Sequence, residues 1–167
     1  MNAEIENLEN WKETKTYISN LFFWSYLGKI NSTFLCEEVS FVMIAETNNI
    51  NQFDFDYISQ VADNIDIYIE NAIEGIKQEL EKNPDMFGIE QEQVAGYLKL
   101  TNKDFPVSNS HITFYPKKEF YLQFYEANFP NAEYGLGIGV NFENDIIKYV
   151  DIPEADESTI IDEDLPR

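Results

Sequence analysis

The stretch that decides the fold is "DFDYISQVADNIDIYIENAIEGIKQELEK", residues 54–82. Its apolar residues recur at three- and four-residue spacing, which places them on one stripe of a helix. Asp54 or Asp56 can cap the start of this helix, and Asn83 should end it, because the residue before a proline avoids the helical conformation. The pattern predicts one long amphipathic helix over about 54–82. Its stripe comprises Phe55, Ile58, Ala62, Ile65, Ile69, Ile73, Ile76 and Leu80.

The segments on either side of this helix predict a sheet. Alternating, aromatic-rich and β-branched runs bounded by turn residues are typical of strands. They occur at 20–28, 33–46, 111–116, 119–126, 134–143 and 146–152. A short second helix is expected at 90–100, and residues 1–20 are interpreted as a short helix or loose arm. The prediction is a single α+β domain over 1–152, with a largely antiparallel sheet and the long helix packed on one face.

The run "YGLGIGVNFE" (134–143) holds three glycines in five positions. A phosphate-binding loop needs a strand, the glycines and then the start of a helix, and no helical pattern follows here. Apolar residues alternate with Gly135, Gly137 and Gly139, as in a strand with one packed face. The bare glycine face indicates that something lies close over it. Two alternatives stay open: the helix approaches there through its own Gly75, or a groove remains.

Charge is the unusual feature of the composition. The chain of 167 residues carries 31 acidic and 11 basic residues, a net charge of −20 spread along the sequence. Such a field repels nucleic acid and anionic membranes and attracts basic proteins. Solubility alone is the alternative explanation. The segment 153–167, which carries six acidic residues, is expected to be a mobile tail.

The remaining composition points to a cytoplasmic protein. Cys36 is the single cysteine, so no intramolecular disulfide can form, and its apolar neighbours predict a buried thiol. The start "MNAEIENLENWKE" lacks the basic and apolar regions of a signal peptide. No apolar run reaches the length of a membrane-spanning helix.

Catalytic motifs are absent from the sequence. His111 is the single histidine and lies near Ser108 and Ser110, but nothing resembles a nucleophile elbow. One histidine and one cysteine are too few for a metal site of that type. We therefore expect no enzyme activity, no cofactor and no metal. The alternative is a small ligand-binding domain or enzyme that uses a groove near the glycine-rich strand and His111.

One face of the predicted helix suggests a binding surface. Asp56, Asp63, Glu70, Glu74 and Glu81 fall together on the helical wheel, away from the apolar stripe. Ile67 lies at the edge of this acidic face, where solvent is expected. An apolar anchor with a charged rim is typical of protein interfaces, although a solvated helix face with one stray isoleucine is the plainer interpretation. The candidate partner-binding residues are Asp63, Ile67, Glu70 and Glu74.

The order of the elements resembles that of small bacterial domains, some of which are similar to immunity proteins encoded beside polymorphic toxins. The resemblance covers roughly 20–152 and rests on three segments. They are the strand pair "FFWSYLG" and "EEVSFVMIAE", the helix "YISQVADNIDIYIENAIEGIKQEL", and "HITFYPKKEFYLQFYEANFPNAEYGLGIGVNFENDIIKYVDI". It implies no enzyme activity and the neutralisation of a cognate toxin. No functional residues carry over, because the resemblance contains no catalytic motif.

Overall fold

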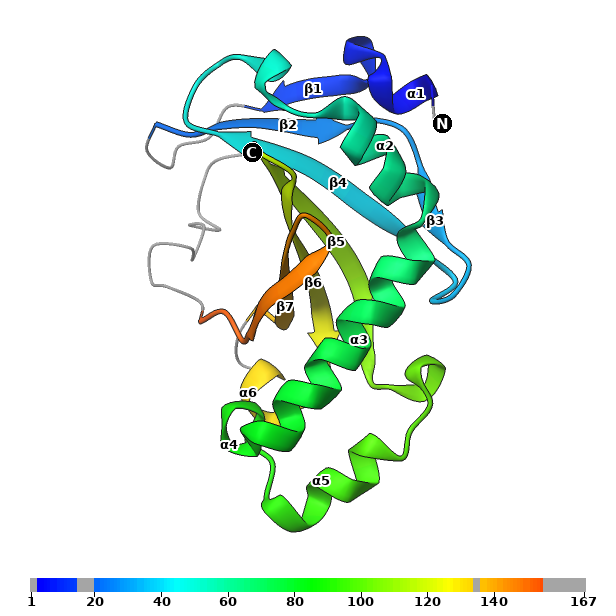
Figure 1. The fold of residues 1–167 in the computed structure, drawn as a ribbon, viewed down its shortest axis with the longest axis vertical. Helices are drawn as coiled ribbons and strands as arrows, with labels where there is room; N and C mark the ends of the chain where they lie inside the picture. Colours follow the sequence, from blue (N-terminus) through cyan, green and yellow to red (C-terminus); the bar gives the residue numbers. More distant parts are fainter. Residues whose placement is uncertain (1–2, 15–19, 134–135, 155–167) are drawn as a thin grey trace, which may run out of the picture.

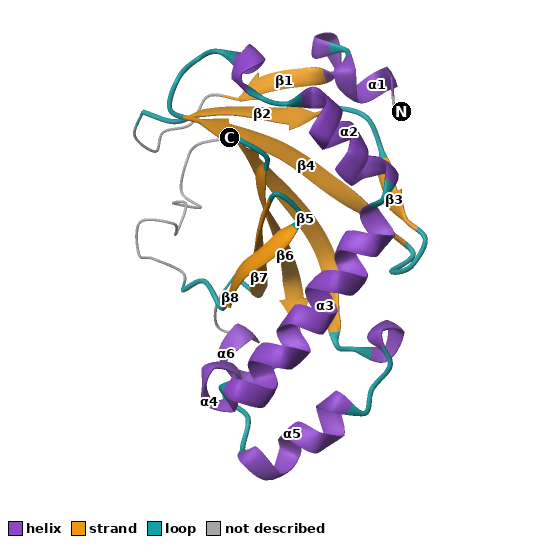
Figure 2. Cartoon of the chain, viewed as in Figure 1, coloured by secondary structure: helices purple, strands orange, loops and turns teal. Residues whose placement is uncertain are grey.

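The computed structural model describes residues 3–14, 20–133 and 136–154. Within these residues eight strands form one sheet, and helices α2 and α3 cross one of its faces (Figures 1 and 2). The strands are β1 (Trp11–Thr14), β2 (Phe22–Tyr26), β3 (Ile30–Ser32), β4 (Glu37–Ala45), β5 (Val107–Tyr115), β6 (Glu119–Ala127), β7 (Ile138–Glu143) and β8 (Ile146–Asp151). The predicted α+β class is confirmed.

The α-helices are α1 (Ala3–Glu6), α2 (Phe55–Asp63), α3 (Ile65–Lys82), α4 (Pro84–Phe87), α5 (Gln91–Leu98) and α6 (Pro130–Glu133). Short 3-10 helices are η1 (Leu8–Asn10), η2 (Ile50–Gln52) and η3 (Asn102–Asp104). Helix α5 lies where the short second helix was predicted. None of the described helices is both long and apolar enough to cross a bilayer.

The strand order in the sheet is β1-β2-β4-β5-β6-β7-β8, and β3 pairs with β4 beside this path. Every pairing is antiparallel except that of β4 with β5, which places Ser40 opposite His111 and Phe41 opposite Ile112. A parallel pair needs a long connection that crosses the sheet. Here the connection is the segment 46–106, and it contains α2, α3, α4 and α5.

The predicted long helix is interrupted at Asn64, so the expectation of one continuous helix over 54–82 is wrong. Asn64 has φ −118° and ψ 26°, and it ends α2 and begins α3. Its side-chain amide donates to the Gln60 carbonyl at 2.8 Å, a local bond by which asparagine competes with helical backbone. Asp54, one of the two predicted caps, accepts a hydrogen bond from the Tyr57 amide at 3.0 Å.

The apolar stripe packs on the sheet in both helices. Seven of its eight members are buried, and only Phe55 is partly exposed. Tyr68 of α3 meets the rings of Phe120 and Phe142 edge-on, with centroids 5.4 and 5.8 Å away. Those two rings stack at 4.7 Å across β6 and β7. The stripe therefore stays buried on both sides of the break at Asn64.

One further expectation holds only in part, and another is wrong. Within 1–20, where a short helix or loose arm was predicted, α1 and η1 are short helices, but residues 11–14 form β1 at the edge of the sheet. The exposed Cys36 lies in the β3–β4 turn with φ 57°, because the apolar run contains a turn before β4 begins. From residue 155 the expected tail lies outside the described residues.

Asp66 fixes the start of α3 against the β3–β4 turn. Its carboxylate accepts hydrogen bonds from the hydroxyl groups of Ser32, at 2.7 Å, and Thr33, and from the Phe34 amide at 3.3 Å. Partial burial raises the pKa of Asp66, but these hydrogen bonds to the charged form outweigh it, and the net pKa is lowered. The orientation of α3 over the sheet is thus set at its first turn.

The helix stripe generates a first prediction. Replacing Ile69, which is fully buried, by alanine should lower the free energy of unfolding by about 2–5 kcal/mol. Ile67→Ala is the matched control on the same helix, because Ile67 is 56% exposed; it should change stability by no more than about 0.5 kcal/mol. Urea unfolding measures both. Equal effects would contradict the packing of α3 on the sheet.

The Asp66 contacts generate a second prediction. A lowered carboxyl pKa stabilises the native state above the unfolded pKa of about 3.9, and this stabilisation is lost as pH falls through the lower folded value. Asp66→Asn should reduce stability at pH 7 and flatten its decrease between pH 5 and pH 2. Urea unfolding across this range tests it, with the exposed Asp56→Asn as the control for net charge. An unchanged pH dependence in Asp66→Asn would contradict the prediction.

Candidate protein-binding site on helix α3 and strand β8

The outer face of α3 carries most of the predicted binding residues. Ile67, Glu70 and Glu74 are exposed on the side of the helix that points away from the sheet. Three- and four-residue spacing brings them onto one line. Asp63 is also exposed, but it is the last residue of α2 and is separated from the others by the break at Asn64. We call the surface formed by Ile67, Glu70 and Glu74 the α3 acidic face.

The break divides the predicted acidic wheel between two helices. Asp56 lies in the first turn of α2, whereas Glu81 lies near the end of α3. Both are exposed. A single helical wheel therefore overstates how closely the whole set is grouped, and the sequence could not reveal this without the position of the break.

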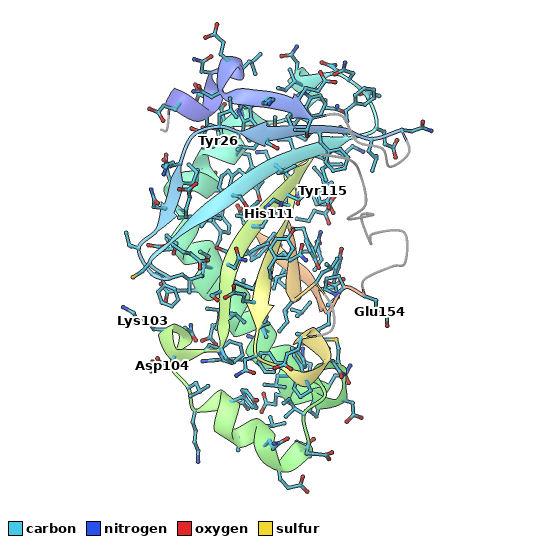
Figure 3. All side chains as sticks on the ribbon, turned by 180° about the vertical axis from the view of Figure 1, so that it is seen from behind. Tyr26, Lys103, Asp104, His111, Tyr115 and Glu154 are labelled. Atoms are coloured by element: carbon cyan, nitrogen blue, oxygen red, sulfur yellow. The ribbon has the colours of Figure 1, made fainter. Side chains whose placement is uncertain are left out.

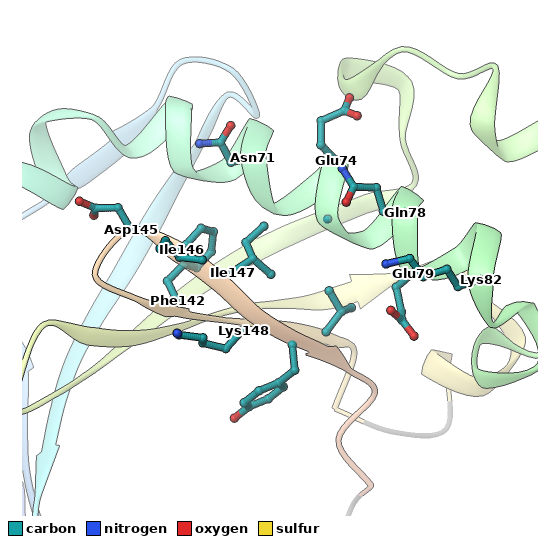
Figure 4. A pocket seen from close by; sticks show the side chains of 13 residues that line it. Asn71, Glu74, Gln78, Glu79, Lys82, Phe142, Asp145, Ile146, Ile147 and Lys148 are labelled. Atoms are coloured by element: carbon teal, nitrogen blue, oxygen red, sulfur yellow. The ribbon is translucent and has the colours of Figure 1, made fainter.

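A groove adjoins this face, between α3 and the edge strand β8 (Figure 4). It encloses about 540 Å³, and its walls include Asn71, Glu74 and Gln78 from the helix. The helix comes close to the strand at Gly75, where an added Cβ would lie 2.7 Å from a methyl group of Ile147. Gly75 thus marks a close approach to the sheet, at β8. We call this feature the α3–β8 groove.

Strand β8 adds exposed apolar side chains to the candidate binding surface. Ile146 is 62% exposed and Tyr149 is 51% exposed, and both line the α3–β8 groove. The β7–β8 register shifts between Phe142, which pairs with Ile147, and Asn141, which pairs with Tyr149. With Ile67, Ile146 gives two exposed apolar anchors on neighbouring elements, which suits an interface centre. Tyr149 borders the groove, but it pairs with Asn141 and points to the sheet face opposite the helices.

The charges around these anchors are mixed, with an acidic excess. The α3–β8 groove is lined by the acidic Glu74, Glu79 and Asp145 and by the basic Lys82 and Lys148. Two of these charged groups already have partners within the protein, which weakens their attraction for a charge on another molecule. Asp145 accepts a 2.6 Å hydrogen bond from the Tyr68 hydroxyl, and Lys148 pairs with Glu143 at 3.4 Å.

Glu74 has only a weak cationic partner. Lys77 lies 3.9 Å from its carboxylate, but the Lys77 ammonium also donates to the Leu100 carbonyl and the Asn102 side chain, each at 2.7 Å. An exposed ion pair at this distance contributes little to stability. The Glu74 carboxylate therefore remains available to a cation from outside.

His111 makes the contact closest to a catalytic pair. Its Nδ1 lies 2.6 Å from the Ser40 hydroxyl, and its ring lies 5.7 Å from that of Tyr125. Burial lowers the pKa of His111, so the ring is neutral at physiological pH. A serine–histidine pair needs a third group to orient the base; within the described residues no carboxylate bonds to this ring. The described residues also contain no group of three metal-ligating side chains.

The glycine-rich strand offers neither a phosphate loop nor an open groove at Gly139. An added Cβ on Gly139 would lie 1.7 Å from the Tyr121 hydroxyl, because the tyrosine ring crosses the strand there. Gly137 has φ +77°, and an added Cβ would meet the Phe124 carbonyl at 1.8 Å. The covering element is thus a tyrosine from β6, and the helix, with Gly75, lies on the other face. Gly135 lies outside the described residues.

Comparisons with known proteins identified no relative of this chain. A scan against protein-family models, a search of curated proteins and a search of solved structures each found no match to this chain.

The glycine contacts generate a third prediction. Gly137→Ala should lower the free energy of unfolding by about 1–3 kcal/mol, because alanine strains a left-handed backbone and meets the Phe124 carbonyl. The matched control is Gly96→Ala in α5, where nothing lies within 4 Å of an added Cβ. There alanine should stabilise by up to about 1 kcal/mol. Thermal and urea unfolding measure the pair, and a tolerated Gly137→Ala would contradict this local geometry.

Proposed function

We propose that this chain is a non-enzymatic binding protein, an acidic inhibitor of the immunity type that neutralises a basic bacterial toxin. The observation that carries the proposal is the α3 acidic face, in which an exposed isoleucine is flanked by carboxylates. Residues of this kind suit a basic partner: the acids complement its charge and the isoleucine supplies a desolvated contact.

The net charge supports the same proposal from another direction. A charge of −20 on 167 residues speeds the encounter with a basic protein through long-range attraction. It also disfavours nucleic acid and anionic membranes as partners. Carboxylates on a protein surface can occupy the cationic site that a nuclease uses for its substrate.

A ligand-binding domain or enzyme at His111 is the second candidate. The Ser40–His111 contact favours it. Tyr121, however, fills the surface over Gly139, where the ligand groove was expected. We therefore rank it below the binding protein.

The test measures association and dissociation rates separately. The chain captures basic proteins from its native cell, and surface plasmon resonance then follows the purified partner across a salt series. Glu70→Lys with Glu74→Lys should slow association by about fivefold or more at 0.1 M salt. The effect should shrink towards 1 M, where the Debye length falls from about 10 Å to about 3 Å. Ile67→Asp should instead speed dissociation by about tenfold, because it removes the apolar anchor.

A matched charge control separates local from global effects. Glu9→Lys with Glu92→Lys changes the net charge equally, from exposed positions on η1 and α5. It should slow association much less than the α3 pair. Rates insensitive to salt and to the α3 reversals would overturn the proposal and leave the acidity as a solubility feature.

A further inference from the structure

The sheet face opposite α2 and α3 is rich in tyrosine (Figure 3, where His111 and Tyr115 mark it). Successive residues of a strand point to opposite faces, so the strands that bury their phenylalanines under the helices present tyrosines on this side. We call this surface the tyrosine face. It comprises Tyr115, Tyr121, Tyr125 and Tyr149, with His111.

Two carboxylates lie among these rings. Pairing places Glu119 opposite Tyr115, and Asp151 opposite Gly139. The Tyr121 hydroxyl donates to Asp151 at 2.5 Å. The Asn141 side chain donates to Glu119 at 3.0 Å, although Asn141 is only 3% exposed. Both carboxylates are therefore held in place by hydrogen bonds from the sheet itself.

The ionisation of the tyrosines agrees with this arrangement. Burial raises the pKa of Tyr115 and of Tyr149, and the negative charges of Glu119 and Asp151 raise both further. The rings therefore stay neutral at physiological pH and keep their electron-rich faces and hydroxyl donors without adding negative charge.

A hollow of about 510 Å³ opens beside Glu119 at the end of this face. Leu21, Ile44 and Tyr115 supply apolar wall, and Glu46 and Glu119 supply carboxylates; the basic Lys117 also lines the hollow. A long cationic side chain matches this combination, since its hydrocarbon stem packs on apolar surface while its charged end reaches a carboxylate.

Neither Glu119 nor Asp151 has a cationic partner in the part of the chain that the structure describes. We propose that the tyrosine face is a second protein-binding surface, which receives an arginine or lysine side chain of a basic partner between Glu119, Asp151 and the rings of Tyr115 and Tyr149. Arginine fits best, because its guanidinium stacks on aromatic rings and bonds carboxylates in two places.

Other occupants fit this face less well. Residues 155–167 carry five acidic residues and one basic residue, so carboxylates repel them. A second copy of the chain brings another charge of −20. This proposal takes only the basic character of the partner from the proposed function. It does not depend on the α3 acidic face, which lies on the opposite side of the sheet.

The test uses an acetylated, amidated Gly-Arg-Gly-Arg-Gly peptide and its citrulline analogue, which keeps the shape and removes the charge. Aromatic proton–carbon NMR of the full chain follows the tyrosine rings during titration. The arginine peptide should shift Tyr115, Tyr121 and Tyr149 most, and the citrulline peptide should bind at least about fivefold more weakly. Equal binding of the two peptides, or shifts centred elsewhere, would overturn the proposal.

Charge-neutralising variants complete the experiment. Glu119→Gln with Asp151→Asn should weaken arginine-peptide binding about fivefold or more, whereas Glu9→Gln with Glu92→Gln, of equal net charge, should change it less than twofold. An equal loss in both pairs would show attraction by net charge alone and overturn the site.

Thermal unfolding checks that each variant folds. Tyr149→Leu keeps the apolar bulk and provides a second test, because it should weaken the same binding. Glu70→Lys with Glu74→Lys should leave the tyrosine shifts in place, which separates this site from the α3 acidic face.

Discussion

The parallel pairing of β4 with β5 is the constraint on which the rest of the structure depends. Because both strands run the same way, the chain must leave one end of the sheet and return to the other. All of α2, α3, α4 and α5 lie within that one connection. The helices α2 and α3 therefore cover a single face (Figure 1), and the opposite face keeps its own side chains at the surface. The α3 acidic face and the tyrosine face both follow from this division.

Local periodicity was enough to predict most of the elements. The stripe from Ile58 to Leu80 is buried, and the β5–β6 hairpin and α5 lie close to their predicted positions. The break at Asn64 was not predictable from the stripe, because apolar spacing continues through it. The parallel pairing was also hidden, since it depends on contacts between residues about 70 positions apart, such as Ser40 and His111.

The residues of the candidate site also divide into those that the sequence could predict and those that it could not. Ile67 was predictable because one helix determines which of its sides faces solvent, and its 56% exposure agrees with that expectation. The exposure of Ile146 and Tyr149 was not predictable, because it depends on β8 lying at the sheet edge and on the register shift within the β7–β8 pair. The cover over Gly139 likewise depends on Tyr121, which reaches it from the neighbouring strand. Which residues lie opposite one another on neighbouring strands depends on the pairing register, and the register cannot be read from the sequence.

Charge alone cannot orient a partner on this molecule. Acidic residues are spread over the whole chain, so the field draws a basic protein to many positions with similar energy. Orientation must come from groups held at fixed places. On the helix side of the sheet, Asp66 holds such a group in place. Its hydrogen bonds to Ser32 and Phe34 fix the first turn of α3, and they thereby fix the direction of the next side chain, Ile67. On the other side, the bond from Tyr121 fixes Asp151. In the proposed complexes, long-range attraction would govern how often partners meet, and these fixed groups would govern which encounters persist.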